Sequence, residues 1–475
     1  MRLITAILAQ VFYLTEEVKA MKLQTIGSTL LFSLLAAIGG GDFPFIPSSE
    51  AKIPSPQALA QNPTGRKTEA DRLLEQGFQQ LQMSQLKAAM ESYQQALIIY
   101  REIKDRQGEG KALGHLGTAY SYLGDYAKAI EYIQQQLAIA REIQDRQSEG
   151  KALGNLGAAY LNLGDYAKAI EYIQQQLAIA REIQDRQSEG KALGNLGAAY
   201  LSLGDYAKAI EYTQQWLAIV REIQDRQSEG KALGNLGAAY LSLGDYAKAI
   251  EYIQQQLTIS RETKDRRNEG AALGNLGFAY MKLGDYAKAI EYTQHLLAIS
   301  REIKDRRNEG AALGNLGFAY MKLGDYTKAI EYAQQHFAIA REIKDRRNEG
   351  TALGILGIAY LNLGDYARAI EYTQQQLAIA REIKDRQNEG KALSNLGWAL
   401  YQQDNLSAAE KTLLDSIQVS ESLRANLDDA QKVSIFDTQI DPYFYLQKVL
   451  IALKKTNEAL EIAERGRGRA FVELL

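Results

Sequence analysis

Apolar residues recur at helical spacing along most of the chain, in a pattern that repeats every 40 residues. Residues 151–190 show the unit clearly. Its first apolar set is Leu153, Leu156, Tyr160 and Leu163, and its second is Tyr166, Ala169, Ile170, Ile173, Leu177, Ala180 and Ile183. Intervals of three and four residues mark one face of a helix. Each unit is therefore predicted to contain two amphipathic helices.

Residues between the two apolar sets predict where each helix ends and the next begins. Gly164 favours a left-handed stop, and Asp165 offers a side-chain acceptor to the free amides of the following helix. Asp185 and Ser188 stand between units and favour a further helix start. Each unit is thus expected to be an antiparallel helical hairpin.

Two glycines, Gly154 and Gly157, recur inside the first helix of most units. A glycine costs about 1 kcal/mol against alanine in a helix interior, so its recurrence requires a packing reason. We expect the missing side chains to let the second helix approach closely, which adds dispersion contacts. A phosphate-binding loop would need a preceding strand, which the pattern does not predict.

The fixed period predicts the fold class. Units begin at residues 71, 111, 151, 191, 231, 271, 311, 351 and 391, with a degenerate unit at 431. Such a period indicates stacked units that bury their apolar faces against one another. The prediction is an all-α protein, a right-handed α-solenoid of antiparallel helical hairpins. Its parts are an N-terminal segment 1–65, a solenoid of about nine units over 66–430, and a capping hairpin over 431–475.

Composition excludes several classes of function. Basic and acidic residues nearly balance, 55 against 58, so no nucleic-acid partner is expected. The chain has no cysteine, and its three histidines, His115, His295 and His336, lack a second ligand at helical spacing. No metal, cofactor or small-molecule substrate is therefore expected. No catalytic residues are expected either, because the sequence does not combine a nucleophile, a base and an orienting group.

The unit resembles the tetratricopeptide repeat through Leu153, Leu156-Gly157, Tyr160, Ala169 and Ile173. It lacks the closing proline of that motif and is longer than the usual unit of about 34 residues. The long unit is similar to the arrays of kinesin light chains and of spindle-orienting G-protein regulators. That resemblance implies a protein-interaction scaffold that binds extended peptides along a concave groove.

The groove implied by the resemblance is lined by the first-helix face that carries Lys151, Asn155, Ala158 and Asn162. The amide column consists of Asn155, Asn195, Asn235, Asn275, Asn315 and Asn395. An amide presents a donor and an acceptor together, so a column of them can pair with a peptide backbone. The alternative is a solvated polar face copied by duplication. His115 and Ile355 interrupt the column.

Later units carry bulkier residues on the same face. These are Phe278, Met281, Lys282, Phe318, Met321, Lys322 and Trp398, where earlier units have alanine, leucine and small polar residues. Apolar and thioether groups suggest an anchoring pocket for a partner side chain, with positive charge beside it. The alternative is that they adjust packing between repeats or were inherited by copied units.

The two ends of the chain suggest further roles. Lys22, the apolar residues 26–38 and the small-residue site at 58–60 resemble a secretory signal, which predicts export; a tail on a cytoplasmic protein is the alternative. The C-terminal run 459–475 resembles the junction between tetratricopeptide arrays and a caspase-like (CHAT) protease domain of bacterial, especially cyanobacterial, proteins. The resulting hypothesis is a peptide-binding scaffold, and a more specific hypothesis makes it the regulatory arm of such a protease. The alternative is a self-assembly module whose units associate between chains.

Overall fold

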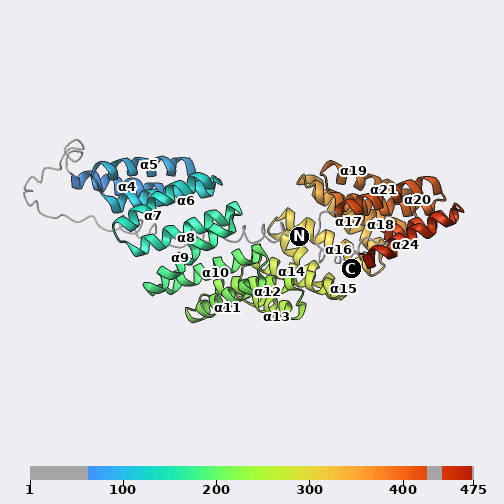
Figure 1. Ribbon diagram of the computed structural model, residues 1–475. Helices are drawn as coiled ribbons and strands as arrows, with labels where there is room; N and C mark the ends of the chain where they lie inside the picture. Colours follow the sequence, from blue (N-terminus) through green and yellow to red (C-terminus); the bar gives the residue numbers. More distant parts are fainter. Residues whose placement is uncertain (1–62, 425–440, 473–475) are drawn as a thin grey trace, which may run out of the picture. The chain divides into compact units, whose positions relative to one another are not determined.

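The computed structural model describes residues 63–424 and 441–472, and every regular element within them is an α-helix (Figure 1). The signal-like segment and residues 425–440 lie outside the described residues. Among the helices that are described, none combines the length and the apolar character needed to cross a bilayer. The predicted all-helical repeat fold is confirmed.

The chain divides into two units, Met1–Asp245 and Tyr246–Leu475. The described helices of the first unit are α4 (Pro63–Gln82), α5 (Leu86–Glu102), α6 (Arg106–Leu123), α7 (Tyr126–Glu142), α8 (Arg146–Leu163), α9 (Tyr166–Glu182), α10 (Arg186–Leu203), α11 (Tyr206–Glu222) and α12 (Arg226–Leu243). Those of the second unit are α13 (Tyr246–Glu262), α14 (Arg266–Lys282), α15 (Tyr286–Glu302), α16 (Arg306–Lys322), α17 (Tyr326–Glu342), α18 (Arg346–Asn362), α19 (Tyr366–Glu382), α20 (Arg386–Gln402), α21 (Leu406–Arg424), α23 (Asp441–Ala452) and α24 (Thr456–Val472).

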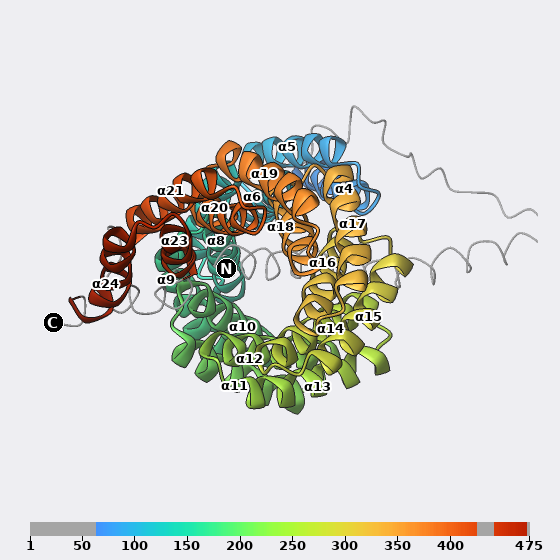
Figure 2. The same cartoon turned by 90° about the vertical axis from the view of Figure 1, so that its right-hand side faces the viewer.

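Each unit is a two-layer stack of hairpins. A first helix packs against the second helix of its own hairpin, as α8 does on α9, and that second helix packs on the next first helix. In the second unit taken by itself, α14, α16 and α18 lie on the inner side of a curve and α15, α17 and α19 on the outer side (Figure 2). The first helices therefore supply the concave face of that unit.

The helix ends follow the residues that predict them. Gly164 has a φ of 78°, and the Asp165 carboxylate accepts a hydrogen bond from the backbone N–H of Lys168 at 3.2 Å. Asp185 accepts from the backbone N–H of Ser188 at 3.0 Å and from its hydroxyl at 2.6 Å. From α6 to α20 these caps place the start of each first helix five residues before the unit boundary read from the sequence, as at Arg146 rather than residue 151.

One residue of the predicted apolar face is not buried. The side chain of Leu163 is 51% exposed, whereas Leu153 and Leu156 are fully buried. Leu163 is the last residue of α8 and stands beside the Gly164 turn, so it lies at the edge of the hairpin contact rather than inside it.

The glycines of the first helix are required by helix contact, as the sequence predicts. A Cβ at Gly157 would lie 2.4 Å from Cγ1 of Ile173, and one at Gly154 would lie 2.6 Å from Nε2 of Gln176. In the next hairpin Trp216 occupies the glutamine position and packs directly over Gly194. Both helices therefore approach more closely than an alanine at these positions would allow.

Ion pairs join successive hairpins in both units. The Glu189 carboxylate accepts from Nε of Arg181 at 2.9 Å and from Arg186 at 2.5 Å, and Arg186 also pairs with Glu222. Burial alone would raise the pKa of Glu189, but the hydrogen bonds from both arginines outweigh it and lower that pKa. The arginines are about half exposed, so each pair contributes only modestly to stability, about 1 kcal/mol or less.

Candidate peptide-binding face

The predicted asparagines occupy one equivalent position on the first helices. In the first unit Asn155, Asn195 and Asn235 lie on α8, α10 and α12, and in the second Asn275, Asn315 and Asn395 lie on α14, α16 and α20. In the first unit the amides form a row because α8, α10 and α12 contact one another in turn. In the second unit Asn275 and Asn315 stand one hairpin apart, and α18 separates Asn315 from Asn395.

The amides of this row are only partly exposed, yet they make no hydrogen bond with any other described residue. Asn195 is the extreme case, with 5% of its surface exposed. Asn162, one turn further along α8, differs because its amide donates to the carbonyl of Ala158 at 2.9 Å. Donor and acceptor groups of the row therefore remain available for a ligand.

Two positions interrupt the row with side chains that pack against neighbouring residues. His115 stacks on Tyr93 with ring centroids 5.0 Å apart, and burial, with minor contributions from Lys151 and Lys111, lowers its pKa to about 4. Ile355 is 6% exposed and belongs to a buried cluster with Leu356. The amide row is thus absent from α6 and α18.

The bulky residues of the later repeats form cation–aromatic pairs on the same helices. The ammonium of Lys282 lies 5.3 Å from the ring centre of Phe278, and that of Lys322 lies 5.4 Å from Phe318. Both rings are half-buried, and Phe318 also packs against the cluster that contains Ile355. Phe318 therefore serves packing between repeats, while part of the surface of both rings stays accessible.

Trp398 contacts the terminal hairpin. Its ring lies 5.1 Å from that of Tyr401 and 4.5 Å from that of Tyr445 on α23, with the ammonium of Lys448 5.2 Å away. Met281 and Met321 are half-buried on α14 and α16. The structure thus places Trp398 against the end of the stack, where packing accounts for most of its contacts.

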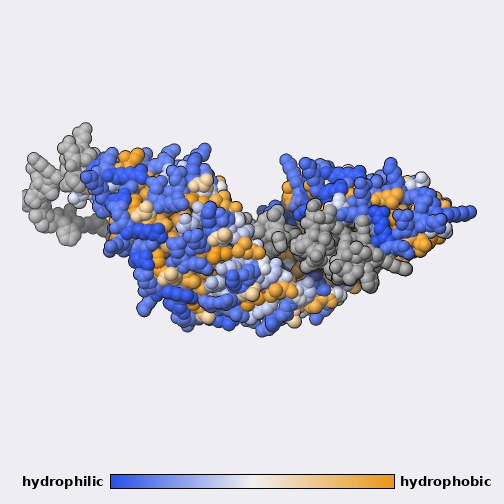
Figure 3. All heavy atoms as spheres, viewed as in Figure 1, coloured by the Kyte–Doolittle hydropathy of each residue, from blue (hydrophilic) through white to orange (hydrophobic). Residues whose placement is uncertain are grey.

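This face carries no acidic residue at the four positions equivalent to 151, 155, 158 and 162 from α6 to α20. Lysines occur there in most hairpins, although the whole chain has a net charge of −3. On the molecular face in Figure 3, hydrophobic atoms are interspersed among hydrophilic ones. In the described part of the chain, no cluster of three or more His, Asp and Glu side chains could hold a metal ion.

A tetratricopeptide repeat model matches residues 69–142, 148–222, 228–302, 268–342, 308–382 and 348–422. The chain belongs to the tetratricopeptide repeat family. Tetratricopeptide repeats are generally scaffolds for protein interaction. Hairpins α4/α5 to α20/α21 are accordingly tetratricopeptide units of the long, 40-residue type.

Known proteins match parts of this tetratricopeptide array. Tetratricopeptide repeat protein 28 of Mus musculus and of Homo sapiens is 42% identical over 79 residues, which is 16% of this chain and 3% of those proteins. A Pyrococcus horikoshii signal-transduction ATPase with a tetratricopeptide repeat sensor has 16% identity and a TM-score of 0.55, over 81% of this chain and 53% of that one. Kinesin light chain repeats of Podosopora anserina have 23% identity and a TM-score of 0.37, over 41% of this chain and 96% of that one.

Several tetratricopeptide units contain a tyrosine stack that the sequence pattern did not predict, because Tyr160 was assigned only to the apolar face. Tyr160 of α8 stacks on Tyr172 of α9 at 5.5 Å, and the ammonium of Lys168 lies 5.2 Å from the Tyr160 ring. The same arrangement recurs in other hairpins of both units. Its signal in the sequence is the repeated Tyr, Lys and Tyr at fixed spacing.

Proposed function

We propose that this array binds an extended peptide or protein segment along the first-helix face. The observation that carries the proposal is the amide row, whose members are half-buried or buried but have no hydrogen-bond partner among the described residues. A peptide backbone that passes along the row would supply a donor and an acceptor to each amide. The concave position of the first helices in the second unit suits such a ligand (Figure 2).

The cation–aromatic pairs of the second unit would anchor a ligand side chain. Phe278 and Phe318 present partly accessible rings one hairpin apart, and Lys282 and Lys322 hold positive charge beside them. Buried aromatic anchors commonly carry about 2 kcal/mol or more of binding energy, roughly thirtyfold in affinity. We therefore expect the second unit to contribute more affinity than the first.

The test uses a peptide that the full chain selects from a random display library. Changing Asn275, Asn315 and Asn395 together to alanine should abolish its binding while thermal stability changes little, because no described group loses a partner. Asn162→Ala is the matched control, since that amide already bonds to its own helix. Unchanged affinity in the triple variant would contradict the proposal.

The anchor is tested separately. Phe278→Ala and Phe318→Ala should each weaken the selected peptide about thirtyfold, whereas Ala158→Ser in the first unit should have no effect. Equal losses in early and late hairpins would show that the bulky residues mark no anchor. Light scattering of the free chain addresses the alternative function, because a self-assembly module would form concentration-dependent polymers.

We propose two further roles from the ends of the chain. The resemblance of 459–475 to a protease junction supports a regulatory arm for a caspase-like domain, which sequencing of the gene beyond codon 475 would test. The signal-like segment supports export to the periplasm or cell surface. Cell fractionation that finds the uncleaved protein in the cytoplasm would contradict export.

A further inference from the structure

The turns between hairpins differ in charge between the two units. In the second unit three successive turns carry exposed cations at two positions, Lys264 and Arg267, Lys304 and Arg307, and Lys344 and Arg347, and the turn before α20 carries Lys384 with Gln387. In the first unit the turns before α8, α10 and α12 have glutamine at both equivalent positions, namely Gln144, Gln147, Gln184, Gln187, Gln224 and Gln227, and only the turn before α6 carries a lysine, Lys104, with Gln107. Residues 301–309 and the equivalent residues 261–269 and 341–349 each hold four cations and three carboxylates. Residues 181–189 hold two cations and three carboxylates.

The fold does not require these cations. Lys264 and Gln144 both adopt the left-handed conformation, with φ of 54° and 55°. The arginines that join hairpins, such as Arg306, occur at the same position in both units. Glutamine therefore satisfies the backbone and packing at these turns as well as lysine or arginine does.

The carboxylates around the turns are already engaged. Glu342 pairs with Arg306, and Asp305 caps α16 by accepting from the backbone N–H of Asn308 at 3.0 Å. Lys304 and Arg307 have no ion-pair partner among the described residues, and the same holds for Lys264, Arg267 and Lys344. Arg347 differs because it pairs with Asp385 at 3.2 Å. Five cations thus remain unneutralised in three successive turns.

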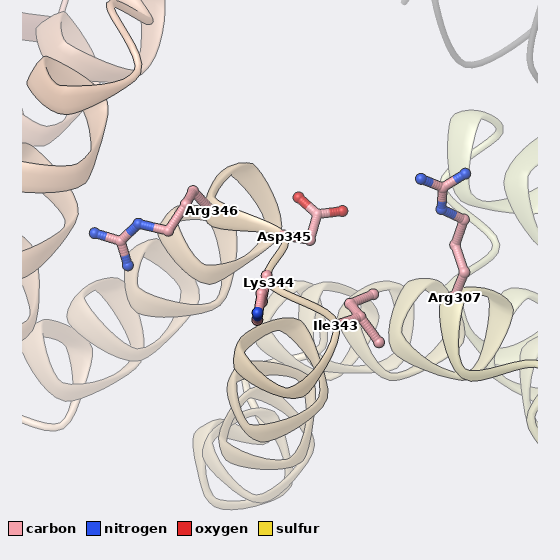
Figure 4. Close-up of a pocket in the computed structure, with 5 residues that line it drawn as sticks. All are labelled: Arg307, Ile343, Lys344, Asp345 and Arg346. Carbon is pink, nitrogen blue, oxygen red and sulfur yellow. The ribbon is translucent and has the colours of Figure 1, made fainter.

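A hollow of about 420 Å³ lies at one of these turns, lined by Arg307, Ile343, Lys344, Asp345 and Arg346. Figure 4 shows Arg307 on α16 at one side, the turn with Lys344 and Asp345 at the other, and Ile343 between them. Ile343 offers an apolar contact, and the cations offer partners for a carboxylate. A glutamate side chain has this combination of an aliphatic stem and an anionic head.

We propose that these turns form a second docking surface, the basic turn edge, which binds an acidic segment of a partner polypeptide. Its members are Lys264, Arg267, Lys304, Arg307 and Lys344. All turns from a second helix to the next first helix lie at the same end of the hairpins, so the cations form a row with one cluster per repeat. The edge is distinct from the first-helix face and does not depend on its ligand.

The chemistry of the edge favours an acidic polypeptide over other polyanions. Nucleic acid carries a closely spaced series of phosphates and is bound by continuous basic surfaces. Here exposed carboxylates of Glu302 and Glu342 stand between the cationic clusters, and the whole chain has net charge −3. Acidic side chains of a polypeptide can be spaced to match the clusters and avoid those carboxylates.

The experiment compares the full chain with a variant in which Lys264, Arg267, Lys304, Arg307 and Lys344 are changed to glutamine. The probe is a fluorescent sixteen-residue polyglutamate peptide, followed by anisotropy at low and physiological ionic strength. We expect the variant to bind at least about tenfold more weakly at low salt, with unchanged circular dichroism and melting temperature. Equal binding by both proteins would overturn the proposal.

Two matched variants separate this surface from the rest of the molecule. Lys282→Gln with Lys322→Gln removes charge from the first-helix face and should leave polyglutamate binding unchanged. A second variant adds cations to the first unit through Gln144→Lys, Gln147→Arg, Gln184→Lys and Gln187→Arg. This variant should bind more polyglutamate peptides per chain than the unaltered protein. Loss of polyglutamate binding in the Lys282→Gln, Lys322→Gln variant would overturn the proposal. Phosphatidylserine vesicles or single-stranded DNA would overturn it as well if either bound more tightly than polyglutamate and lost that binding when the five cations were replaced.

Discussion

The imidazole of His336 is buried in the second unit without a hydrogen-bond partner. Its side chain on α17 is 2% exposed, neither ring nitrogen is bonded, and a Cβ at Gly314 would lie 2.8 Å from its Cε1. Burial lowers the pKa of His336 to about 4, with Asp345 opposing slightly. Glutamine occupies the equivalent position in other hairpins, as at Gln176 and Gln376, so His336→Gln is a substitution that the fold tolerates.

The expected effect follows from the difference between the folded and unfolded pKa values. A histidine whose folded pKa lies below the unfolded value of about 6.5 contributes its full stability above pH 6.5 and loses it as pH falls toward 4. The calculated loss is about 2 kcal/mol at pH 5 and about 0.2 kcal/mol at pH 7. His336→Gln removes this loss, so the variant should gain on the wild type as the solution is acidified.

The assay is thermal unfolding followed by circular dichroism at pH 7 and pH 5. For a unit of this size, 2 kcal/mol corresponds to about 4–8 °C in the transition of the second unit. His295→Gln is the control, because that side chain is exposed on α15. This substitution should shift the melting temperature by the same amount at pH 7 and at pH 5. A melting difference between wild type and His336→Gln that is the same at both pH values would refute the reasoning.

Three further predictions concern the stack of hairpins. Gly157→Ala should lower the free energy of unfolding by about 1–2 kcal/mol in urea titrations, because the cost of overpacking exceeds the gain in helix propensity. Gly110→Ala is the control and should be neutral or stabilising, because a Cβ at Gly110 would lie 3.4 Å from Cγ2 of Ile139, its nearest neighbour. Glu189→Gln should cost about 1 kcal/mol at pH 7, and this difference should vanish as pH falls through the lowered pKa of the native carboxyl. Deleting 191–230 should leave a shorter folded array with proportionally lower helical ellipticity, since contacts run between neighbours; loss of helicity throughout would contradict this.

The fold could be predicted from the sequence because every local signal is repeated. Gly164, Asp165 and Asp185 each indicate a helix boundary only weakly, but the same residues recur at the same positions in most units. The packing role of Gly157 followed for the same reason. A helix-breaking residue that is copied many times has to be compatible with the structure.

The burial of polar groups could not be predicted in the same way. Glu189 and Gln176 are polar in the sequence but buried between helices, because each meets a partner or a glycine surface on another helix. The amide row was predicted as a position, while its lack of hydrogen-bond partners became evident only from the structure. The basic turn edge was readable in the change from glutamine to lysine and arginine, but its importance depends on which carboxylates are already paired.

The packing of Trp216 over Gly194 and of Trp398 against Tyr445 has a consequence for spectroscopy. These are the two tryptophans of the chain, one in each unit and in different surroundings, one nearly enclosed and one stacked between tyrosines. Replacing either by phenylalanine leaves a single indole emitter. Its fluorescence then reports the state of one unit alone, without an attached dye.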